Sequence, residues 1–407
     1  MNVLDKSILH ECTSCQMCAA VCPKNAIDIV LNADGFYRPT INHALCVDCG
    51  ICTKVCYKYD AQVRVTSRQD LAQKPLYASW ALDDELVKNT TSGGIGDLLA
   101  RELIAEGYKV AGVVYNDEKV RAEHTIANTI KETLPFRGSK YIQSYTIDAL
   151  KDIVANCRNE RYAVFGTPCQ IYALSKMAEM RKVRDNFLFV DLYCHGCPSL
   201  HAWTKYQDYI KQKLDIQHFD KVEFRSKVKG WGSFYVVVVV VDGKPVFQSN
   251  PREDGFYELF FSDQVLNDGC SDCKLRSTIS YTDIRLGDFW GKKYLHNQRG
   301  VSGVCICSER GMSLFDKIKD NISFDRCEHD EFLPWQSWGK TYHPNPKIRE
   351  AVLKSLKNGD ETIADAVNVF RTHQNIKGKL KRHVKHMLHY LPLGTTNFLK
   401  RFIYDEN

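Results

Sequence analysis

The sequence of 407 residues has no long apolar run. The longest, from Tyr235 to Val241, is far shorter than the roughly 20 residues that a helix needs to cross a bilayer. Its β-branched residues predict a buried strand instead. With 44% hydrophobic and 11% aromatic residues, the chain can build a sizeable core. We therefore expect a globular protein of roughly two to three domains and no membrane span.

The sequence also lacks the common phosphate-binding and nucleic-acid-binding signatures. It has neither a Walker A loop nor a GxGxxG motif. Aromatic residues are absent from the basic segment between Lys377 and His389, whereas single-stranded nucleic-acid binders interleave aromatic with basic residues. We therefore expect no nucleic-acid partner. Internal repeats are missing as well, apart from one doubled cysteine motif.

That doubled motif contains eight of the 17 cysteines. Both copies have the spacing CxxCxxCxxxC, which is typical of bacterial-type ferredoxins. In such domains three closely spaced thiolates bind one cubane, and the fourth cysteine binds the other cubane. This rule assigns one [4Fe-4S] cluster to Cys12, Cys15, Cys18 and Cys56, and a second to Cys46, Cys49, Cys52 and Cys22. Pro23 follows the first copy, as is usual, but Tyr57 takes the equivalent position in the second.

Zinc and disulfides are the alternatives for these eight cysteines. Structural zinc motifs usually have two separated pairs of ligands, whereas here a third cysteine follows each pair and the whole arrangement repeats. No signal-peptide pattern precedes the cysteines, and cubanes are assembled from reduced thiols, which disfavours disulfides. We therefore expect iron–sulfur clusters in a reducing cytoplasm.

The chain divides into three expected parts. Residues 1–65 are expected to form an α+β ferredoxin-like cluster domain, with a hairpin turn at residues 32–35. In residues 76–310, strands alternate with amphipathic helices, which favours an α/β core with a mostly parallel mixed sheet. Residues 311–407 are expected to form a helical, basic C-terminal extension. The predicted strands of the core are 109–115, 162–165, 187–192, 234–241 and 304–307, and its predicted helices are 94–106, 148–157, 170–180 and 200–214.

The positive net charge is concentrated in residues 340–407, where 13 Lys+Arg against 6 Asp+Glu give +7, while the rest of the chain carries −1. Basic residues from Lys377 to Lys385 interleave with leucine and valine. A basic amphipathic helix could lie on anionic lipid or bind a partner. A solvated C-terminal helix is the simpler interpretation, and a peripheral membrane contact stays open beside it.

Five further cysteines stand near strand ends in the core, enough for a third metal site. One set of two CxxC pairs would resemble a zinc ribbon: Cys194, Cys197, Cys270 and Cys273. A different set would hold a cubane: Cys169, Cys194, Cys270 and Cys273. A further redox centre would extend the electron pathway of the N-terminal clusters, whereas zinc would interrupt it. This argument favours the cubane.

A loop of hydroxyl residues and glycines, Ser92-Gly93-Gly94, precedes a predicted amphipathic helix. Backbone N–H groups at a helix start can bind an anion such as a cofactor phosphate. An ordinary helix cap would have the same composition. The loop is therefore a candidate cofactor site only in combination with other features.

Several short segments follow one another through residues 76–310 in a specific order. They are Ser92-Gly93-Gly94, Gly138-Ser139-Lys140-Tyr141, Gly166-Thr167-Pro168-Cys169-Gln170, Tyr193-Cys194, Phe224-Arg225-Ser226-Lys227 with Gly230-Trp231, Cys270 with Cys273, and Asp283 with Gly287-Asp288 and Trp290. This order resembles the beta subunit family of the coenzyme F(420)-reducing hydrogenases and dehydrogenases. The resemblance implies a flavoprotein that binds FAD and one [4Fe-4S] cluster in its core, and some members carry a two-cluster ferredoxin domain at the N-terminus.

The resemblance also assigns residues. The core cluster would be held by Cys169, Cys194, Cys270 and Cys273, which leaves Cys197 surplus. FAD would lie along the segments that contain Ser92, Gly93, Gly94, Ser139, Lys140, Tyr141, Thr167 and Gln170. Lys140 would suit a flavin phosphate or the negative charge of the reduced ring, and a surface lysine is the alternative. No residue receives a catalytic role, although His195 is the nearest candidate.

Together these features predict an iron–sulfur flavoprotein oxidoreductase. Single electrons would pass along the two ferredoxin clusters and the core cluster to FAD, which exchanges hydride or electrons with a small organic acceptor or donor. A deazaflavin coenzyme is one candidate acceptor, and reduced ferredoxin or another redox protein is the expected partner. The alternative is a non-catalytic electron-transfer subunit of a larger redox complex.

Overall fold

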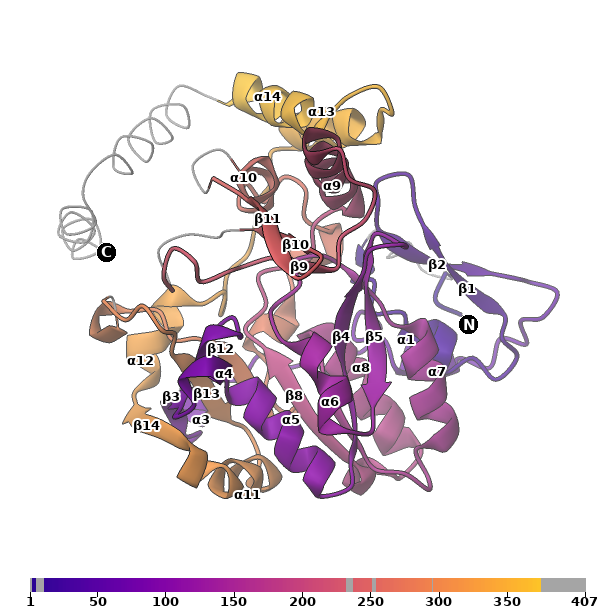
Figure 1. Ribbon diagram of the computed structural model, residues 1–407. Coiled ribbons are helices and arrows are strands. Elements are labelled where there is room, and N and C mark those ends of the chain that lie inside the picture. The colour runs from indigo at the N-terminus through magenta and orange to yellow at the C-terminus, as the bar shows by residue number, and fades with distance from the viewer. Residues whose placement is uncertain (1, 5–10, 232–236, 251–253, 295, 375–407) are drawn as a thin grey trace.

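The computed structural model describes the chain except for residues 1, 5–10, 232–236, 251–253, 295 and 375–407 (Figure 1). The basic amphipathic segment expected between Lys377 and His389 lies outside the described residues. None of the described helices is both long and apolar enough to pass through a lipid bilayer.

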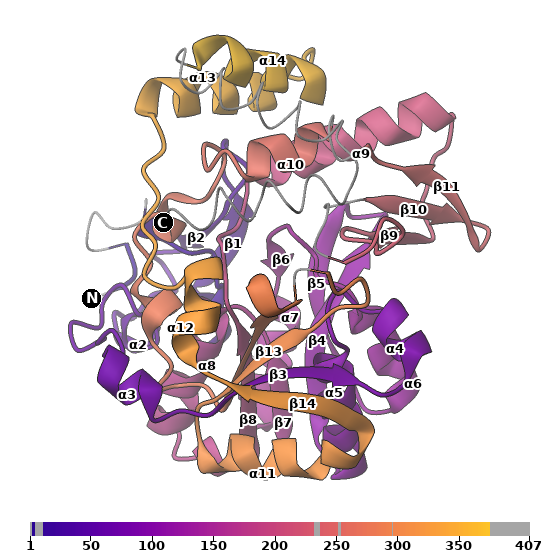
Figure 2. The ribbon, with the colours of Figure 1, turned by 90° about the vertical axis from the view of Figure 1, so that its left-hand side faces the viewer.

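A mixed sheet of nine strands forms the centre of the molecule (Figures 1 and 2). From one edge to the other it consists of β14 (Ile322–Cys327), β3 (Leu76–Ala81), β13 (Ser302–Ile306), β12 (Ile284–Asp288), β8 (Phe187–Leu192), β7 (Tyr162–Phe165), β4 (Lys109–Asn116), β5 (Arg121–Ala127) and β6 (Ser144–Tyr145).

The expected mixed sheet is confirmed, but only half of its pairings are parallel. The pairings of β12 with β8, β8 with β7, and β7 with β4 are parallel, as is the edge pair of β5 with β6. The remaining four pairings are antiparallel. The difference arises because β5 returns directly beside β4, and β13 beside β12, without the crossover that a parallel partner requires, and because β3 lies antiparallel between β13 and β14.

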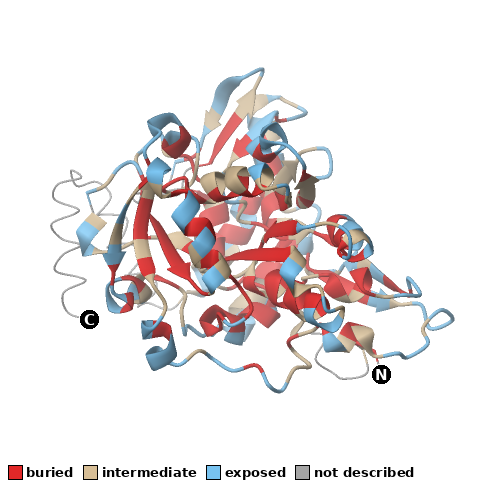
Figure 3. Ribbon diagram, turned by 90° about the horizontal axis from the view of Figure 1, so that it is seen from below, coloured by how far each residue is buried: buried red, intermediate tan, exposed pale blue. Residues whose placement is uncertain are grey.

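Helices cover both faces of the sheet. One face carries α5 (Ile95–Ala105) and α11 (Glu309–Lys317), and the other carries α7 (Ile147–Asn156) and α8 (Pro168–Met180). Neighbouring strand residues alternate between these faces: Val110 packs with α5 and α11, whereas Ala111 packs with α7 and α8. The inner strands of the sheet are mostly buried and the helices expose one side (Figure 3). The predicted alternation of strands and helices is thus confirmed.

A second apolar core lies beyond the carboxyl end of β8 (Figure 2). It contains α9 (Leu200–Leu214), β9 (Lys221–Glu223), β10 (Val238–Val241), β11 (Lys244–Gln248), α10 (Gly255–Phe260), α13 (Pro346–Lys357) and α14 (Ile363–His373). The strand expected at 234–241 is described only as β10, which belongs to an antiparallel three-stranded sheet rather than to the main one. Shorter helices complete the fold: α3 (Arg68–Ala72), α4 (Asp84–Lys88), α6 (Ile130–Thr133) and α12 (His329–Phe332).

The sheet extends beyond residue 310, the expected end of the core. β14 lies past this boundary and pairs along its whole length with β3. The following helices α13 and α14 are part of the second apolar core and not a detached extension. The described part of the C-terminal region therefore belongs to the body of the molecule.

The N-terminal unit contains α1 (Met17–Ala20), α2 (Ile51–Lys54) and a hairpin of β1 (Ile27–Leu31) and β2 (Tyr37–Ile41). The hairpin confirms the turn predicted at residues 32–35, where Gly35 has a φ of +78°. α1 packs against α7 and α8, so this unit shares the apolar core on that face of the sheet. The cysteine motifs are thereby placed beside the main sheet.

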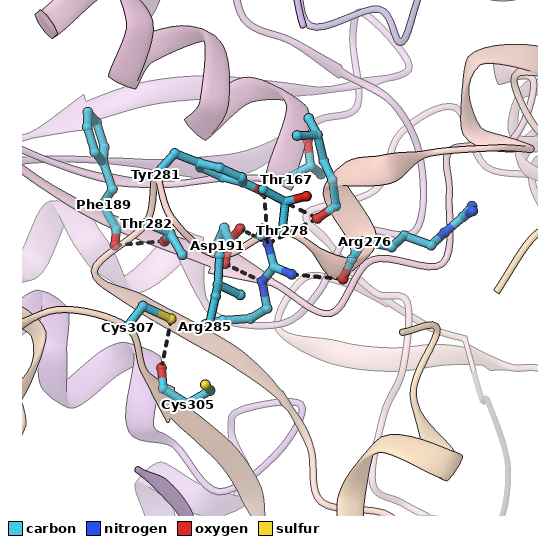
Figure 4. Close-up of polar contacts among 12 residues, drawn as sticks. Thr167, Phe189, Asp191, Arg276, Thr278, Tyr281, Thr282, Arg285, Cys305 and Cys307 are labelled. Atoms are coloured by element: carbon cyan, nitrogen blue, oxygen red, sulfur yellow. Dashed lines mark hydrogen bonds and ion pairs between the residues drawn. The ribbon is translucent and has the colours of Figure 1, made fainter. Parts of the chain in front are cut away.

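A fully buried ion pair links two adjacent parallel strands (Figure 4). Arg285 in β12 donates from Nε to Oδ1 of Asp191 in β8 at 2.8 Å. Its terminal nitrogens also face the carbonyl oxygens of Leu275, Arg276 and Thr278. The pair therefore connects the sheet to the chain segment that follows Cys273.

Replacing Asp191 with asparagine should leave the Arg285 guanidinium buried without its counter-charge. We expect the D191N variant to lose about 3–5 kcal/mol in free energy of unfolding, measured by anaerobic urea unfolding. The ion pair of Arg68 and Asp330 is exposed, so D330N is the matched control and should unfold almost as the wild type does. Equal losses in the two variants would contradict a special role of the buried pair.

Candidate metal centres and cofactor loop

The eight N-terminal cysteines surround two separate cavities. The first cavity is lined by Cys12, Cys15, Cys18 and Cys56, and the second by Cys22, Cys46, Cys49 and Cys52. Each set combines cysteines from both copies of the motif. The exchange of the fourth cysteine follows from the short helices α1 and α2, since each carries the chain from one cavity to the other. The structure thus groups these side chains as the ferredoxin rule predicts.

Burial makes the inner set a poor environment for thiolates without a metal. It raises the pKa values of Cys15 and Cys18 well above the usual thiol value, and neighbouring thiols raise them further. The pKa of Cys56 is raised to about 11, chiefly by burial. A coordinated metal deprotonates a thiol and supplies the missing positive charge. The four thiols therefore fit a cationic metal centre.

The core cysteines come from three chain segments: two follow the strands β7 and β8, and the third, with Cys270 and Cys273, lies between α10 and β12. Cys169 stands at the start of α8, where its Sγ lies 3.3 Å from Thr167 Oγ1, and Cys194 follows β8. The pKa of Cys194 is raised by burial and then by three nearby thiols: Cys270, Cys169 and Cys273. Burial likewise raises the pKa of Cys169 to about 12. The structure therefore brings together the four cysteines of the cubane assignment.

Cys197 also lies in this region. Its thiol is an immediate neighbour of the Cys270 thiol. Within the described residues, no three His, Cys, Asp or Glu side chains converge closely enough to hold a single metal ion. A cubane distributes its thiolates over four irons and therefore separates them more widely than one ion does.

A buried arginine that the sequence did not reveal supports the core cysteines. Arg276 donates to the carbonyl oxygens of Cys270, Ser271 and His195. Its guanidinium lies 4.3 Å from the ring centroid of Tyr342. Because it lies beside the thiols, its positive charge favours their ionised forms. The one sequence signal was a basic residue shortly after the second CxxC pair.

The N-terminal unit touches the core cysteines directly. A Cβ atom on Gly269 would stand 2.2 Å from the carbonyl oxygen of Glu11, so only glycine allows the two chain segments to approach this closely. The hydroxyl of Tyr57 lies 3.7 Å from Cys273 Sγ. Cys15 and Cys169 are near enough for each thiolate to disfavour ionisation of the other. The inner N-terminal cysteines and the core cysteines are therefore adjacent.

The predicted cofactor loop follows β3, whose carboxyl end lies on the same side of the sheet as the carboxyl end of β8. The N–H of Gly93 donates to Ser302 Oγ at 2.9 Å, and a Cβ here would stand 2.3 Å from the carbonyl oxygen of Ser79. Gly94 has a φ of +83° and begins α5, a start that no side chain of the described residues caps. Ser92 donates its hydroxyl to the carbonyl oxygen of Val301. The loop thus presents the start of a helix beside β13.

The second predicted segment meets this loop through a hydroxyl. Ser139 donates its N–H to Thr91 Oγ1 at 2.7 Å. Lys140 instead uses its ammonium to bind the carbonyl oxygens of the short 3-10 turn at 134–136 and of the residue after it. Burial lowers the pKa of Lys140 to about 7. A phosphate at Lys140 would therefore have to replace one of these carbonyl contacts.

The other predicted cofactor residues have identified local roles. Thr167 and Gln170 form the capping box of α8, and Gln170 also donates to Ser144 Oγ at 3.0 Å. The Tyr141 hydroxyl accepts from Arg225 Nη1 at 3.5 Å. These contacts place Thr167 and Gln170 beside Cys169, and Tyr141 beside the basic loop, which contains Arg225, Lys227 and Lys229.

Arg225 of the basic loop lies in an aromatic and acidic setting. It donates from Nη1 to Asp288 Oδ2 at 2.6 Å, and its guanidinium lies 4.7 Å from the Trp290 ring centroid. Trp290 stacks on Trp231 with centroids 4.6 Å apart. Lys227 donates to the carbonyl oxygen of Ser92 at 2.6 Å. The basic loop is therefore anchored to both β12 and the glycine loop.

Replacing Gly269 with alanine should force the N-terminal unit away from the core cysteines. The backbone overlap should cost about 1–3 kcal/mol and accelerate amide hydrogen exchange around residues 11–15 and 267–273. Gly359 has open space around its Cα, so G359A is the matched control and should leave exchange unchanged. Unchanged exchange in G269A would show that the two segments do not approach as described.

Comparisons with known proteins match the segments of the chain that contain the cysteine sets. Residues 159–331 match the family described as the C terminus of the coenzyme F420 hydrogenase/dehydrogenase beta subunit, and residues 11–59 match the 4Fe-4S dicluster domain. The second match covers both copies of the cysteine motif, and the first covers all four cysteines of the core set. The three cysteine sets therefore lie within residues that known families match, whereas the predicted cofactor segments at 92–94 and 138–141 lie outside them.

Two of the similar curated proteins align with this chain over most of their own length. One is a subunit of the F(420)H(2) dehydrogenase of Methanosarcina mazei, 23% identical over 331 residues, which are 77% of this chain and 84% of that protein. The other is the beta subunit of the coenzyme F420 hydrogenase of Methanococcus voltae, 29% identical over 258 residues, which are 61% of this chain and 85% of that protein.

Among solved structures, a chain of the F420-reducing [NiFe] hydrogenase complex from Methanosarcina barkeri superposes with a TM-score of 0.46 at 19% identity, covering 75% of this chain and 94% of that chain. The family matches confirm the resemblance inferred from the order of the motifs. The chain thus contains, in residues 159–331, a domain of the family described as the C terminus of the coenzyme F420 hydrogenase/dehydrogenase beta subunit, and near its N-terminal end a 4Fe-4S dicluster domain.

Proposed function

We propose that the chain is an iron–sulfur flavoprotein oxidoreductase that relays electrons along three [4Fe-4S] clusters and exchanges them with an organic acceptor through FAD. The observation that carries this proposal is the continuity of three cysteine sets. In spatial order they are Cys22, Cys46, Cys49 and Cys52, then Cys12, Cys15, Cys18 and Cys56, then Cys169, Cys194, Cys270 and Cys273.

Adjacent sets are close to one another. Cys18 of the inner N-terminal set is a near neighbour of Cys52 in the outer set. On the other side, Cys15 is a near neighbour of Cys169 in the core set. Electron transfer needs such proximity, because its rate falls steeply with distance. The outer set is also the more accessible one, since Cys49 is exposed, and it would receive electrons from a redox protein.

The chain's own groups would tune these centres. The potentials of iron–sulfur clusters depend on net charge, solvent exposure and hydrogen bonds to sulfur. Here Arg276 supplies a buried positive charge beside the core thiols, and the buried Arg285 fixes the segment behind them. These contacts support a redox role for the core set in place of a purely structural one.

FAD fits the glycine loop in part. Ser92, Gly93 and Gly94 offer a helix start without a side-chain cap. Ser139 lies next to this loop, and Tyr141 lies next to the basic loop. Lys140 fits less well, because three carbonyl oxygens already accept from its ammonium. A bound flavin would supply the conversion between one-electron and two-electron chemistry. Thr167 and Gln170 would contribute by holding the start of α8 beside Cys169.

The names of the relatives suggest the acceptor. Both curated relatives carry coenzyme F420 in their names, so a deazaflavin coenzyme is the acceptor or donor we propose first. Reduced ferredoxin or a comparable redox protein in a reducing cytoplasm is the proposed electron partner. The direction of flow depends on the relative potentials of the partner and the coenzyme.

A second function is favoured by the same names. Both relatives are called subunits, which suggests that the chain serves a catalytic partner as a non-catalytic electron-transfer subunit. This function needs the clusters but no exchange of hydride by the chain alone. Turnover of a deazaflavin coenzyme by the purified chain distinguishes the two functions.

Replacing Cys273 with serine tests the core cluster. The anaerobically purified wild-type chain should contain about twelve irons, and C273S should lose about four of them. Cys327 is also buried but lies outside the three sets, so C327S should retain the wild-type iron content. Unchanged iron in C273S would refute the core cluster, and about eight irons with one zinc in the wild type would replace it by a zinc site.

Flavin content and hydride exchange test the enzyme function. The purified chain should contain about one FAD and should bleach an oxidised deazaflavin coenzyme when it is given reduced ferredoxin. Alanine at Gly94 should lower the FAD content, because its Cβ would stand 2.2 Å from Leu86 Cδ2 at a φ of +83°. Gly243 has a similar φ of +69° in open space, so G243A is the control. A chain without flavin or turnover supports the electron-transfer subunit instead.

A further inference from the structure

Tyr57 is the residue at which the second cysteine motif departs from the first. Pro23 follows Cys22, whereas Tyr57 follows Cys56. Proline can only shape the exit turn of the motif. Tyrosine adds a long side chain with a hydroxyl, and here only 7% of this residue is exposed to solvent. The substitution therefore introduces a buried polar group beside a predicted cluster ligand.

The Tyr57 side chain crosses from the N-terminal unit to the core cysteines. Its hydroxyl lies 3.7 Å from Cys273 Sγ and 3.5 Å from the carbonyl oxygen of Gly269. A phenol has a single hydrogen to donate, so these two acceptors compete for it. An ionised sulfur is the stronger acceptor, because hydrogen bonds to charged groups are stronger than those between neutral groups. Metal-bound Cys273 would therefore accept the hydrogen bond from Tyr57.

The position of Tyr57 between two cysteine sets is set by its neighbours. Lys58 places its ammonium 5.0 Å from the Tyr57 ring centroid, and Tyr172 packs edge-on at 6.1 Å. The backbone of Tyr57 continues directly from Cys56. A side chain that is bonded to one set through the backbone and hydrogen-bonded to the next can influence how they share an electron.

We propose that Tyr57 is a positioning residue whose hydroxyl donates a hydrogen bond to the Cys273 thiolate and thereby raises the reduction potential of the core centre. The proposal rests on the proposed function, because it requires a cluster at the core cysteines. A donor stabilises the more electron-rich state of a metal–thiolate centre, so the core centre accepts electrons more readily. One electron leaves the inner N-terminal centre as one enters the core centre, while Tyr57 keeps its proton and is not oxidised.

Two phenylalanine substitutions make a matched pair. Y57F removes the hydroxyl and keeps the ring that fills the space between the two units. Y172F removes a hydroxyl from the adjacent ring, and this hydroxyl binds Asp60. Both variants lose one buried oxygen in the same apolar cluster, but only Y57F changes a contact to sulfur.

The potentials are measured by anaerobic redox titration of the full chain with electron paramagnetic resonance detection. The core signal is the one that C273S lacks. In Y57F this signal should titrate at a lower potential. We expect the equilibrium constant for one-electron reduction of the core centre to fall on the order of tenfold, which corresponds to ~59 mV. In Y172F the potential should stay at the wild-type value. Pulsed measurements in deuterated water should detect a deuteron coupled to the reduced core centre, and this coupling should be absent in Y57F.

Each other outcome overturns one identified statement. An unshifted core potential in Y57F, or equal shifts in Y57F and Y172F, refutes the role of the hydroxyl. Loss of the core irons in Y57F refutes it as well, because Tyr57 would then hold the site together instead of tuning it. If the wild-type chain itself has no signal that depends on Cys273, the proposed function fails, whatever Y57F does.

Discussion

The buried ion pair of Arg285 and Asp191 is the contact on which the arrangement of the core cysteines depends. It joins two parallel strands in the interior, where an unpaired charge would be very costly. The remaining guanidinium hydrogens fix the carbonyl oxygens of the segment after Cys273. Arg276 in that segment in turn binds the carbonyl oxygens around Cys270 and His195. Arg285 thus holds the backbone of Arg276 to the sheet, and Arg276 holds the backbone of the cysteine loop.

The rigid loop provides the surface on which the N-terminal unit rests. Gly269 lets the backbone of Glu11 approach within a distance that no side chain would allow, and Tyr57 fills the adjacent space. Through this contact the core set becomes a neighbour of the inner N-terminal set, although the two are far apart in sequence. The glycine loop before α5 lies at the same edge of the sheet, because β3, like β7, β8 and β12, ends there. Parallel strands gather their carboxyl-end loops at one edge, which is where ligands of such sheets bind.

Prediction from sequence succeeded where the information was local. The pairing of Cys12, Cys15 and Cys18 with Cys56 follows from motif spacing, and the bounds of α9 follow from hydrophobic periodicity. It failed for the sheet direction at β13 and β14 and for the domain end at residue 310, because strand order depends on pairings between distant segments. The family pattern suggests a phosphate at Lys140, but the ammonium of Lys140 binds three carbonyl oxygens of a turn that its sequence neighbours form.

The sequence by itself determined the doubled cysteine motif of the dicluster domain, the alternation of strands and helices, and the resemblance of the core to the beta subunit family, since all three depend on residue types at short spacings. Only the tertiary structure decided that the core cysteines lie beside the inner N-terminal set and where Tyr57 directs its hydroxyl. Cys273 is 216 residues away from Tyr57 along the chain, and their contact depends on the close approach at Gly269. Contacts of this kind are selected by packing and by the burial of charge, which no local pattern encodes.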